Sequence, residues 1–323
     1  MRKANFAVLA ILTALTSFTG IGRPDSRSAA ESIQRQPEAQ MQTSDRPREI
    51  LVNGTRRTYI PHVPPEYKKE KHLPLVIVLH GGGGNAENMI RRTRFSEKAD
   101  RENFVVVYPN GSGRSEESLL TFNAVGCCAY AMRNKVDDVA FVSKLIDVLT
   151  AEYGIDKKRV YVTGFSNGAM IASYLAASIS NKIAAVAPVS GAIFASSPKP
   201  IGTMAVLLIH GTADTAVPYD GGMSKRPVII PSQSEPYRSV FDGAKYWAEN
   251  SNCKGTPETK TSGIVTTERF VGCAAGSEVE VISIKGGVHA WPGGNNGRGA
   301  ADAPSVDLNA TDAIWDFFKK HHR

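Results

Sequence analysis

Gly164-Phe165-Ser166-Asn167-Gly168 is the stretch of sequence that decides the fold. A β-branched run at residues 160–163 precedes it, and an apolar helical pattern at residues 169–180 follows it. Gly-x-Ser-x-Gly between a strand and a helix is typical of a sharp turn that exposes the serine at one edge of a sheet. Glycine suits both flanks because so tight a turn leaves no room for side chains. The five residues alone would fit an ordinary glycine-rich turn, so the strand and helix around them carry the interpretation.

Short apolar strands alternate with helical patterns on both sides of this turn. The expected strands are residues 75–79, 104–108, 160–163, 184–189, 206–210 and 278–284. The expected helices are residues 88–103, 139–153, 169–180, 237–250 and 310–321. A hairpin opens the ordered chain, because Asn53-Gly54 suits a type I′ turn between strands at 50–52 and 55–63. Fully apolar strands between helices predict one α/β domain, with a mostly parallel sheet covered on both faces.

Two later residues complete a constellation with Ser166. A serine hydroxyl is a poor nucleophile at neutral pH and needs an adjacent base. In folds with such a turn, the acid and then the base follow later strands of the sheet. Asp214 comes just after the strand at 206–210, and His289 just after the strand at 278–284. Because open α/β sheets place their sites at the carboxyl ends of strands, we predict Ser166 as nucleophile, His289 as base and Asp214 as the acid that orients it.

Other histidines and acids are poorer candidates. Two histidines end strands beside glycines and are expected to shape turns, two lie before the serine, and two close the chain (His80, His210; His62, His72; His321, His322). Asp220 is the rival acid, but it lies in the turn-like sequence Tyr-Asp-Gly-Gly. Asp137 and Asp138 are expected to cap the helix at 139–153, since acids suit a helix N-terminus.

The oxyanion that develops on a substrate needs preorganised donors. One is expected to be the backbone N–H of Asn167, directly after the nucleophile. The other should come from the glycine run at residues 80–84, where missing side chains allow close approach; Gly82 is the choice, with Gly81 and Gly83 as alternatives. A phosphate loop would need a Lys-Ser/Thr pair after these glycines, and none follows.

The N-terminus predicts export. Arg2 and Lys3 precede the apolar run at residues 6–18, which has the length of a secretory signal and is short of the roughly 20 residues that span a bilayer. We interpret residues 1–22 as a signal peptide, 23–47 as a disordered linker poor in aliphatic residues, and 48–323 as the catalytic domain. The expected location is extracellular or periplasmic, with no stable membrane span after cleavage.

Charge and composition exclude some partners. The formal net charge is +7, but the basic residues are scattered and form no run interleaved with aromatics. Nucleic-acid binding is therefore not expected. A chain of this length can bury a sizeable core, so its fold is expected to need no metal or disulfide as a staple.

Four cysteines in an exported protein indicate disulfides. Cys253 and Cys273 bracket a short polar segment and are expected to close it as a loop, with a stabilisation of about 3 kcal/mol. Cys127 and Cys128 are adjacent, so a bridge between them would be strained. Three states stay open for these two cysteines: a bond to each other, bonds to Cys253 and Cys273, or free thiols.

The motifs together resemble a known group of enzymes, the bacterial polyhydroxybutyrate depolymerase-like esterases, which are grouped with the feruloyl and acetylxylan esterases of carbohydrate esterase family one. The resemblance rests on LHGGGGNAENM (79–89), VVVYPNGSGR (105–114), FNAVGCCAYA (122–131), VDDVAF (136–141), TGFSNGAM (163–170), HGTADTAVPYDGG (210–222) and GGVHAWPGG (286–294). It implies the α/β-hydrolase fold without a large lid domain, a serine carboxylic ester hydrolase, the same triad of Ser166, Asp214 and His289, and no cofactor.

The resemblance does not identify which ester is the substrate. Hydroxybutyrate oligomers and feruloyl or acetyl esters of plant polysaccharide are the expected substrates; crystalline polyester is not, since the chain has no added binding module after its last helix. The gap between residues 189 and 206 is too short for a lid. The loop at 220–236 is expected to shape the acyl or alcohol pocket, and Trp291 either forms an aromatic wall there or packs in the core.

Three other functions remain as alternatives. A serine peptidase uses the same fold and triad, but such peptidases generally carry a gating domain for which this chain has no room. A secreted binding protein with an inactive fold is disfavoured because all three triad positions are filled. A lipase is disfavoured by the missing lid.

Overall fold

The computed structural model describes residues 45–115, 118–297 and 301–323, all within one unit, Met41–Arg323. The predicted signal peptide and most of the predicted linker lie outside the described residues. The strands are β1 (Arg48–Val52), β2 (Thr55–His62), β3 (Leu75–Leu79), β4 (Val105–Pro109), β5 (Val160–Phe165), β6 (Ala185–Val189), β7 (Ala205–Gly211), β8 (Glu258–Ser262), β9 (Val265–Phe270) and β10 (Val279–Ile284). The α-helices are α1 (Ala86–Thr93), α2 (Phe95–Glu102), α3 (Ala129–Arg133), α4 (Asp138–Tyr153), α5 (Asn167–Ser178), α6 (Val240–Asn250) and α7 (Ala310–Phe318).

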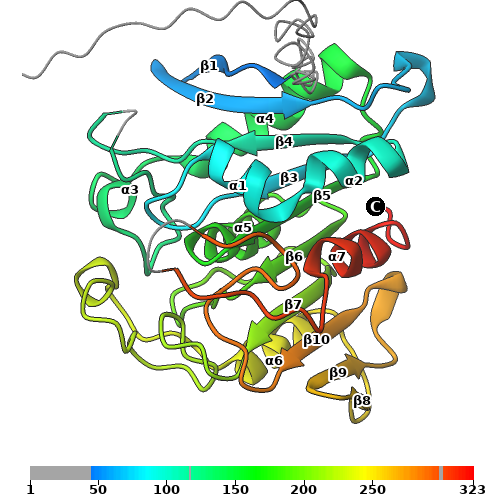
Figure 1. Cartoon of the computed structure of the whole chain (residues 1–323). Helices are drawn as coiled ribbons and strands as arrows, with labels where there is room; N and C mark the ends of the chain where they lie inside the picture. Colours follow the sequence, from blue (N-terminus) through cyan, green and yellow to red (C-terminus); the bar gives the residue numbers. More distant parts are fainter. Residues whose placement is uncertain (1–44, 116–117, 298–300) are drawn as a thin grey trace, which may run out of the picture. The chain divides into compact units, whose positions relative to one another are not determined.

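The strands form a single sheet in the order β1-β2-β4-β3-β5-β6-β7-β10-β9-β8. Its centre, from β4 to β10, is parallel, and the strands at both edges are antiparallel. The predicted hairpin forms one edge, where β1 pairs with β2 around a turn with positive φ at Asn53 and Gly54. The mostly parallel sheet that the alternation of strands and helices predicted is therefore present (Figure 1).

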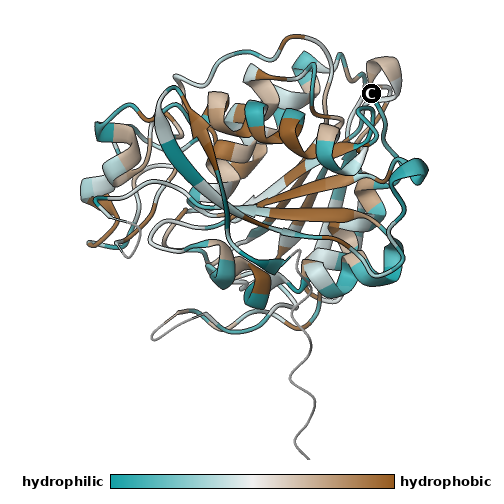
Figure 2. Ribbon diagram, turned by 90° about the horizontal axis from the view of Figure 1, so that it is seen from above, coloured by the Kyte–Doolittle hydropathy of each residue, from teal (hydrophilic) through white to brown (hydrophobic). Residues whose placement is uncertain are grey.

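Two apolar clusters cover opposite faces of the sheet. Along β3, Leu75 and Ile77 belong to one cluster and Val76 to the other, as the alternation of strand side chains requires. Helices α4, α5 and α6 pack on the first face, and α1, α2 and α7 on the second. The central strands are the brown, hydrophobic part of Figure 2. This double cover holds the carboxyl ends of the parallel strands in fixed positions.

Two elements differ from the expectations. The helix expected at residues 88–103 is two helices, because Arg94 has φ 56° and ends α1 before α2 begins. Neither glycine nor proline marks this break, so the apolar spacing runs through it. The hairpin of β8 and β9 was not predicted, since every residue of β8 is exposed and shows no buried alternation.

The two acids expected as caps have different roles. Asp137 does cap α4, and its Oδ1 accepts the N–H of Ala140 at 2.9 Å. Asp138 was wrongly predicted as a cap: it is buried, and its carboxylate pairs with buried Arg57 at 2.6 Å and accepts the N–H of Asn123 at 2.7 Å. The Asp138 carboxylate thus forms a buried ion pair with Arg57, which lies on β2 of the edge hairpin.

Cys253 is joined to Cys273, as the sequence predicted, and the bond closes the segment that contains the β8–β9 hairpin. Cys127 and Cys128, whose state the sequence left open, are joined to each other. Within the described ranges no helix combines the length and the apolar character needed to cross a bilayer.

Candidate active site

Ser166 lies on a strained turn between β5 and α5. Its backbone has φ 54° and ψ −118°, a conformation that serine rarely adopts. A Cβ on Gly164 would lie 2.4 Å from the carbonyl oxygen of Gly168, and one on Gly168 would lie 2.2 Å from that of Leu79. The two glycines of the motif are therefore required by the close approach of backbone to backbone, as the sequence analysis argued.

Asp214 and His289 are in contact at the same end of the sheet. His289 Nδ1 donates to Asp214 Oδ2 over 2.7 Å, and the other carboxylate oxygen accepts the N–H groups of Ala216 and Val217, each at 2.8 Å. Burial disfavours the charged carboxylate, but hydrogen bonds from His210 and His289 outweigh it and hold the pKa of Asp214 well below its usual range. Asp214 is therefore a buried carboxylate that stays ionised.

Glycines let the loops of the acid and the base meet. A Cβ on Gly211 would lie 2.3 Å from the carbonyl group of Gly287, so the two backbones touch where β7 and β10 end. The N–H of Ala213 donates to Gly287 O at 2.8 Å, and that of Gly286 to Thr212 Oγ1 at 2.9 Å. These contacts hold the Asp214 loop against the His289 loop.

Ser166 and His289 line one cavity of about 360 Å³, which we call the serine cavity. A volume of this size suits a small organic group. Its walls come from the glycine run after β3, from the segment at 119–129 with the Cys127–Cys128 pair, and from the loop at 226–232. The loop at 220–236 that the sequence singled out therefore does border the cavity. Among the described residues no direct hydrogen bond joins the Ser166 hydroxyl to His289; such bonds are often long before substrate binds.

The expected oxyanion donors also line the serine cavity. A Cβ on Gly82 would lie 3.7 Å from that of Asn167, so the two residues are neighbours. The Asn167 side chain is buried and exchanges two hydrogen bonds with the backbone of Phe122, at 2.8 and 2.9 Å, which fixes the start of α5. The N–H of Gly83, one alternative, already donates to Leu120 O at 2.8 Å.

Trp291 does not line the serine cavity, so of the two roles left open for it the structure supports packing in the core and not an aromatic wall that contacts substrate. The side chain is 1% exposed and packs edge-on against Phe95 with 6.2 Å between ring centroids. Its indole N–H donates to Thr311 Oγ1 at 3.1 Å. The chain turns after His289, so that the side chain two positions later enters the core beneath α7.

His80 and His210 shape turns, as expected. His80 Nδ1 donates to Gly81 O at 2.8 Å and Nε2 accepts the N–H of Gly111 at 2.9 Å, a pattern that requires a neutral ring. Burial lowers the pKa of His80 to about 4. His210 Nε2 donates to Val217 O at 2.8 Å and lies 3.4 Å from Asp214 Oδ2, so this ring supports the Asp214 loop. Asp220, the rival acid, is exposed.

Several residues of the serine cavity were missed by the sequence analysis. Asp302 accepts the backbone N–H of His289 at 3.1 Å and pairs with Arg226. Arg92, from the last turn of α1, and Phe165 complete the wall beside Ser166. Arg92 and Asp302 lie far from the serine in sequence and carry no local signal, whereas Phe165 is part of the motif itself.

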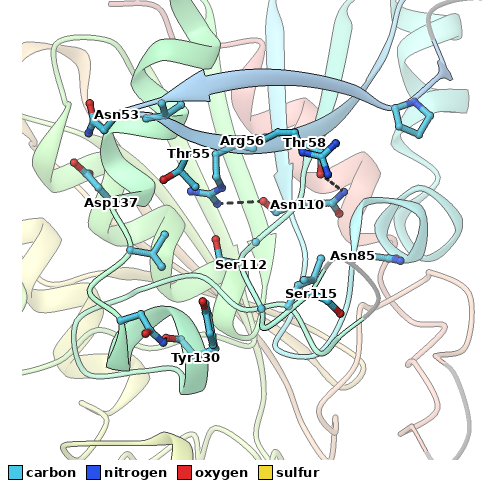
Figure 3. Close-up of a pocket in the computed structure, with 18 of the residues that line it drawn as sticks. Asn53, Thr55, Arg56, Thr58, Asn85, Asn110, Ser112, Ser115, Tyr130 and Asp137 are labelled. Atoms are coloured by element: carbon cyan, nitrogen blue, oxygen red, sulfur yellow. Dashed lines mark hydrogen bonds between the residues drawn. The ribbon is translucent and has the colours of Figure 1, made fainter.

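A larger cavity of about 690 Å³ lies under the β1–β2 hairpin (Figure 3). Most of the residues that line it have polar side chains; Asn110 Nδ2, for example, donates to Thr58 Oγ1 at 3.0 Å. None of the predicted catalytic residues borders this cavity, so the serine cavity is the candidate active site. Among the described residues, no group of His, Cys, Asp and Glu is arranged to hold a metal ion.

Comparisons with known proteins identify a family for this chain. Residues 57–227 match the family described as esterase PHB depolymerase. The chain is 32% identical to the putative esterase NocK of Nocardia uniformis subsp. tsuyamanensis, over 88% of this chain and 85% of that protein. It is 28% identical to feruloyl esterase B of Piromyces equi over 82% of this chain, but it spans only 45% of that protein.

A solved structure confirms the fold. The acetyl xylan esterase from Aspergillus awamori superposes with a TM-score of 0.59 at 16% identity, over 85% of this chain and 99% of that chain. At this sequence identity, the structural similarity supports a shared fold and nothing beyond it. The predicted α/β-hydrolase architecture is therefore confirmed.

Proposed function

Because this chain belongs to the esterase PHB depolymerase family, and is thus a carboxylic ester hydrolase, we propose that Ser166, His289 and Asp214 are its catalytic triad. The observation that carries the proposal is the 2.7 Å hydrogen bond from His289 Nδ1 to the buried Asp214 carboxylate, beside the strained Ser166 in one cavity. Because Nδ1 donates to the carboxylate, Nε2 is the nitrogen that can accept a proton.

In the first step Ser166 Oγ attacks the ester carbonyl carbon while His289 Nε2 takes the hydroxyl proton. The N–H groups of Gly82 and Asn167 donate to the oxyanion of the tetrahedral intermediate; losing one such donor typically raises the barrier by about 2.7–4 kcal/mol. His289 then protonates the departing alcohol, and the acyl group stays on Ser166. Asp214 keeps the imidazole in the productive tautomer and stabilises its positive charge.

In the second step water replaces the alcohol. His289 Nε2 removes a proton from the water, which attacks the acyl-enzyme carbonyl and releases the acid. Serine regains its proton from His289, so each cycle converts one ester and one water into an alcohol and an acid, and the chemistry uses only side chains and backbone N–H groups of the chain.

For substrates we propose hydroxybutyrate oligomers, or feruloyl and acetyl esters carried on plant polysaccharide. The cavity volume of about 360 Å³ fits acyl groups of this size. We also propose that the protein is exported, with residues 1–22 as signal peptide, 23–47 as linker and 48–323 as catalytic domain. The basic and apolar start of the sequence and the Cys253–Cys273 bond support export, because disulfides persist in oxidising compartments.

The proposal is tested by a parallel assay on hydroxybutyrate oligomers, methyl ferulate and acetylated xylan, with nitrophenyl acetate as a control for general esterase activity. We expect turnover of at least one natural ester, and a fluorophosphonate adduct that maps to Ser166. A peptide amide hydrolysed as fast as the esters would favour a peptidase instead. An adduct on another residue would refute the assignment of the nucleophile.

A further inference from the structure

Arg92 is a cation in the serine cavity that has no anion of its own. It lines the cavity together with Ser166 and His289, and it is only partly exposed. In the part of the chain that the structure describes, its guanidinium makes no hydrogen bond or ion pair. Burial lowers its pKa, yet arginine remains charged at neutral pH. The cavity therefore holds a positive charge without an internal partner.

The other charges of the cavity are already paired. Arg226 pairs with Asp302, and Asp302 also accepts the backbone N–H of His289 at 3.1 Å. Asp214 faces His289 and His210 behind the cavity wall. Among the described residues that line the cavity, Arg92 therefore carries a positive charge that no carboxylate balances.

Arg92 is held close to the reacting groups. Its Cζ lies 4.7 Å from the centroid of the Phe165 ring, and the His289 ring centroid lies 4.7 Å from the same point. Arg92 Cζ therefore lies no farther from the centroid of the His289 ring than twice 4.7 Å. Phe165 directly precedes Ser166, and Arg92, Phe165 and Ser166 line the same cavity, so the cation lies near the nucleophile.

The backbone around Arg92 is fixed to the loop that follows the base. Asn295 donates its N–H to Arg92 O at 3.0 Å and its side-chain amide to Arg91 O at 2.7 Å. Gly297 lies against the guanidinium, since a Cβ there would be 2.4 Å from Nη2. The cation is thus held at the cavity wall, where it is only partly exposed to solvent.

We propose that Arg92 is a specificity-determining residue that binds a carboxylate on the substrate, close to the ester bond that is cleaved. An unpaired cation in a partly apolar cavity is stabilised by an anion, and a guanidinium matches a carboxylate with two parallel hydrogen bonds. The inference rests on the proposed ester hydrolysis at Ser166 and refines its substrate class. Hydroxy-acid oligomers with a free carboxyl end, or esters beside a uronic acid, fit this class; feruloyl and acetyl esters of neutral sugars do not.

The test compares acids with amides of the same shape. One pair, O-acetyl-hydroxybutyrate and O-acetyl-hydroxybutyramide, carries the test group on the alcohol side of the ester. A second pair, monoethyl glutarate and ethyl glutaramate, carries it on the acyl side. For each ester, kcat/KM is measured for the full chain, for Arg92→Gln and Arg92→Lys, and for Arg91→Gln. Arg91 is the matched control because it lies on the same helix but is exposed and does not line the cavity.

We expect the unaltered protein to prefer the acid over its amide by about 10- to 100-fold in at least one pair, as a charged hydrogen bond implies. Arg92→Gln should bring the ratio of kcat/KM for acid over amide to about one, whereas Arg92→Lys should keep part of the preference. Arg91→Gln should leave it unchanged. Added salt should weaken the preference of the unaltered protein.

Equal kcat/KM for acid and amide in both pairs would overturn the inference, and so would a preference that Arg92→Gln leaves intact. Both results differ from failure of the proposed function, in which none of the four esters is hydrolysed and nitrophenyl acetate is not hydrolysed either. A preference in the first pair points to hydroxy-acid or uronic-acid leaving groups, and one in the second pair to diacid acyl groups.

Discussion

His289 and Asp214, 75 positions apart in the chain, are joined by a hydrogen bond of 2.7 Å from the imidazole Nδ1 to the carboxylate Oδ2. The other carboxylate oxygen, Oδ1, accepts the backbone N–H groups of Ala216 and Val217, so the carboxylate is held in a single orientation. This contact leaves His289 Nε2 as the acceptor at the cavity that Ser166 lines. The mechanism proposed above depends on this orientation.

Asp214→Asn should lower kcat by roughly four orders of magnitude, because an amide favours the wrong tautomer of His289. The far-UV circular dichroism should stay unchanged. Asp220→Asn is the matched control, since Asp220 is the rival acid and is exposed, and it should retain full kcat. If the Asp220 variant lost activity and the Asp214 variant kept it, the assignment of the acid would be wrong.

Gly168→Ala should destabilise the protein by roughly 1–3 kcal/mol and reduce activity, because the new Cβ would meet two backbone carbonyls, of Leu79 and His80, at 2.2 and 2.5 Å. The control is Gly243→Ala in α6, where a Cβ meets only Ile193 at 3.9 Å. That change should be neutral or stabilising, since alanine favours a helix. Urea unfolding measures both. Equal stability of the two variants would argue against the packing described at the turn.

His62 should make stability depend on pH. Burial lowers its pKa, but hydrogen bonds to Asp45 and Asp100, each at 2.8 Å, outweigh this and raise it above the usual value of 6.5. The stabilisation is therefore complete below the unfolded pKa and is lost as pH rises through the folded one. His62→Gln should cost more unfolding free energy at pH 5 than at pH 9. A cost that is the same at both pH values would contradict this account.

The bond between Cys253 and Cys273 should stabilise the domain by about 3 kcal/mol. The double variant Cys253→Ser, Cys273→Ser should therefore unfold at lower urea concentration while it keeps its triad, which lies elsewhere. Peptide mapping without reducing agent checks the pairing directly. Recovery of a peptide that links Cys253 to Cys127 or Cys128 would show that the pairing is crossed.

Most of the framework of the site could be predicted from the sequence, because its signals are local. The glycines around Ser166 follow from steric need, and Asp214 and His289 each come just after a strong apolar strand. What failed depends on tertiary contacts. Trp291 follows the base by two positions, and only the course of the loop decides whether it faces the cavity or the core. Arg92 enters the site from α1 through packing that no sequence pattern encodes.

The same limit applies to secondary structure. The break at Arg94 depends on a left-handed residue that nothing in the apolar spacing marks. The hairpin of β8 and β9 lies at an edge of the sheet, where exposed strands lack the alternation that reveals buried ones. Both elements lie outside the serine cavity, and neither affects the assignment of the triad.

The most direct test of the account is the turnover of nitrophenyl acetate by purified Ser166→Ala. The account predicts that kcat falls by roughly four to six orders of magnitude, while the unfolding midpoint stays close to that of the unaltered protein. Turnover within tenfold of the unaltered protein, in a folded variant, would contradict the claim that Ser166 is the nucleophile.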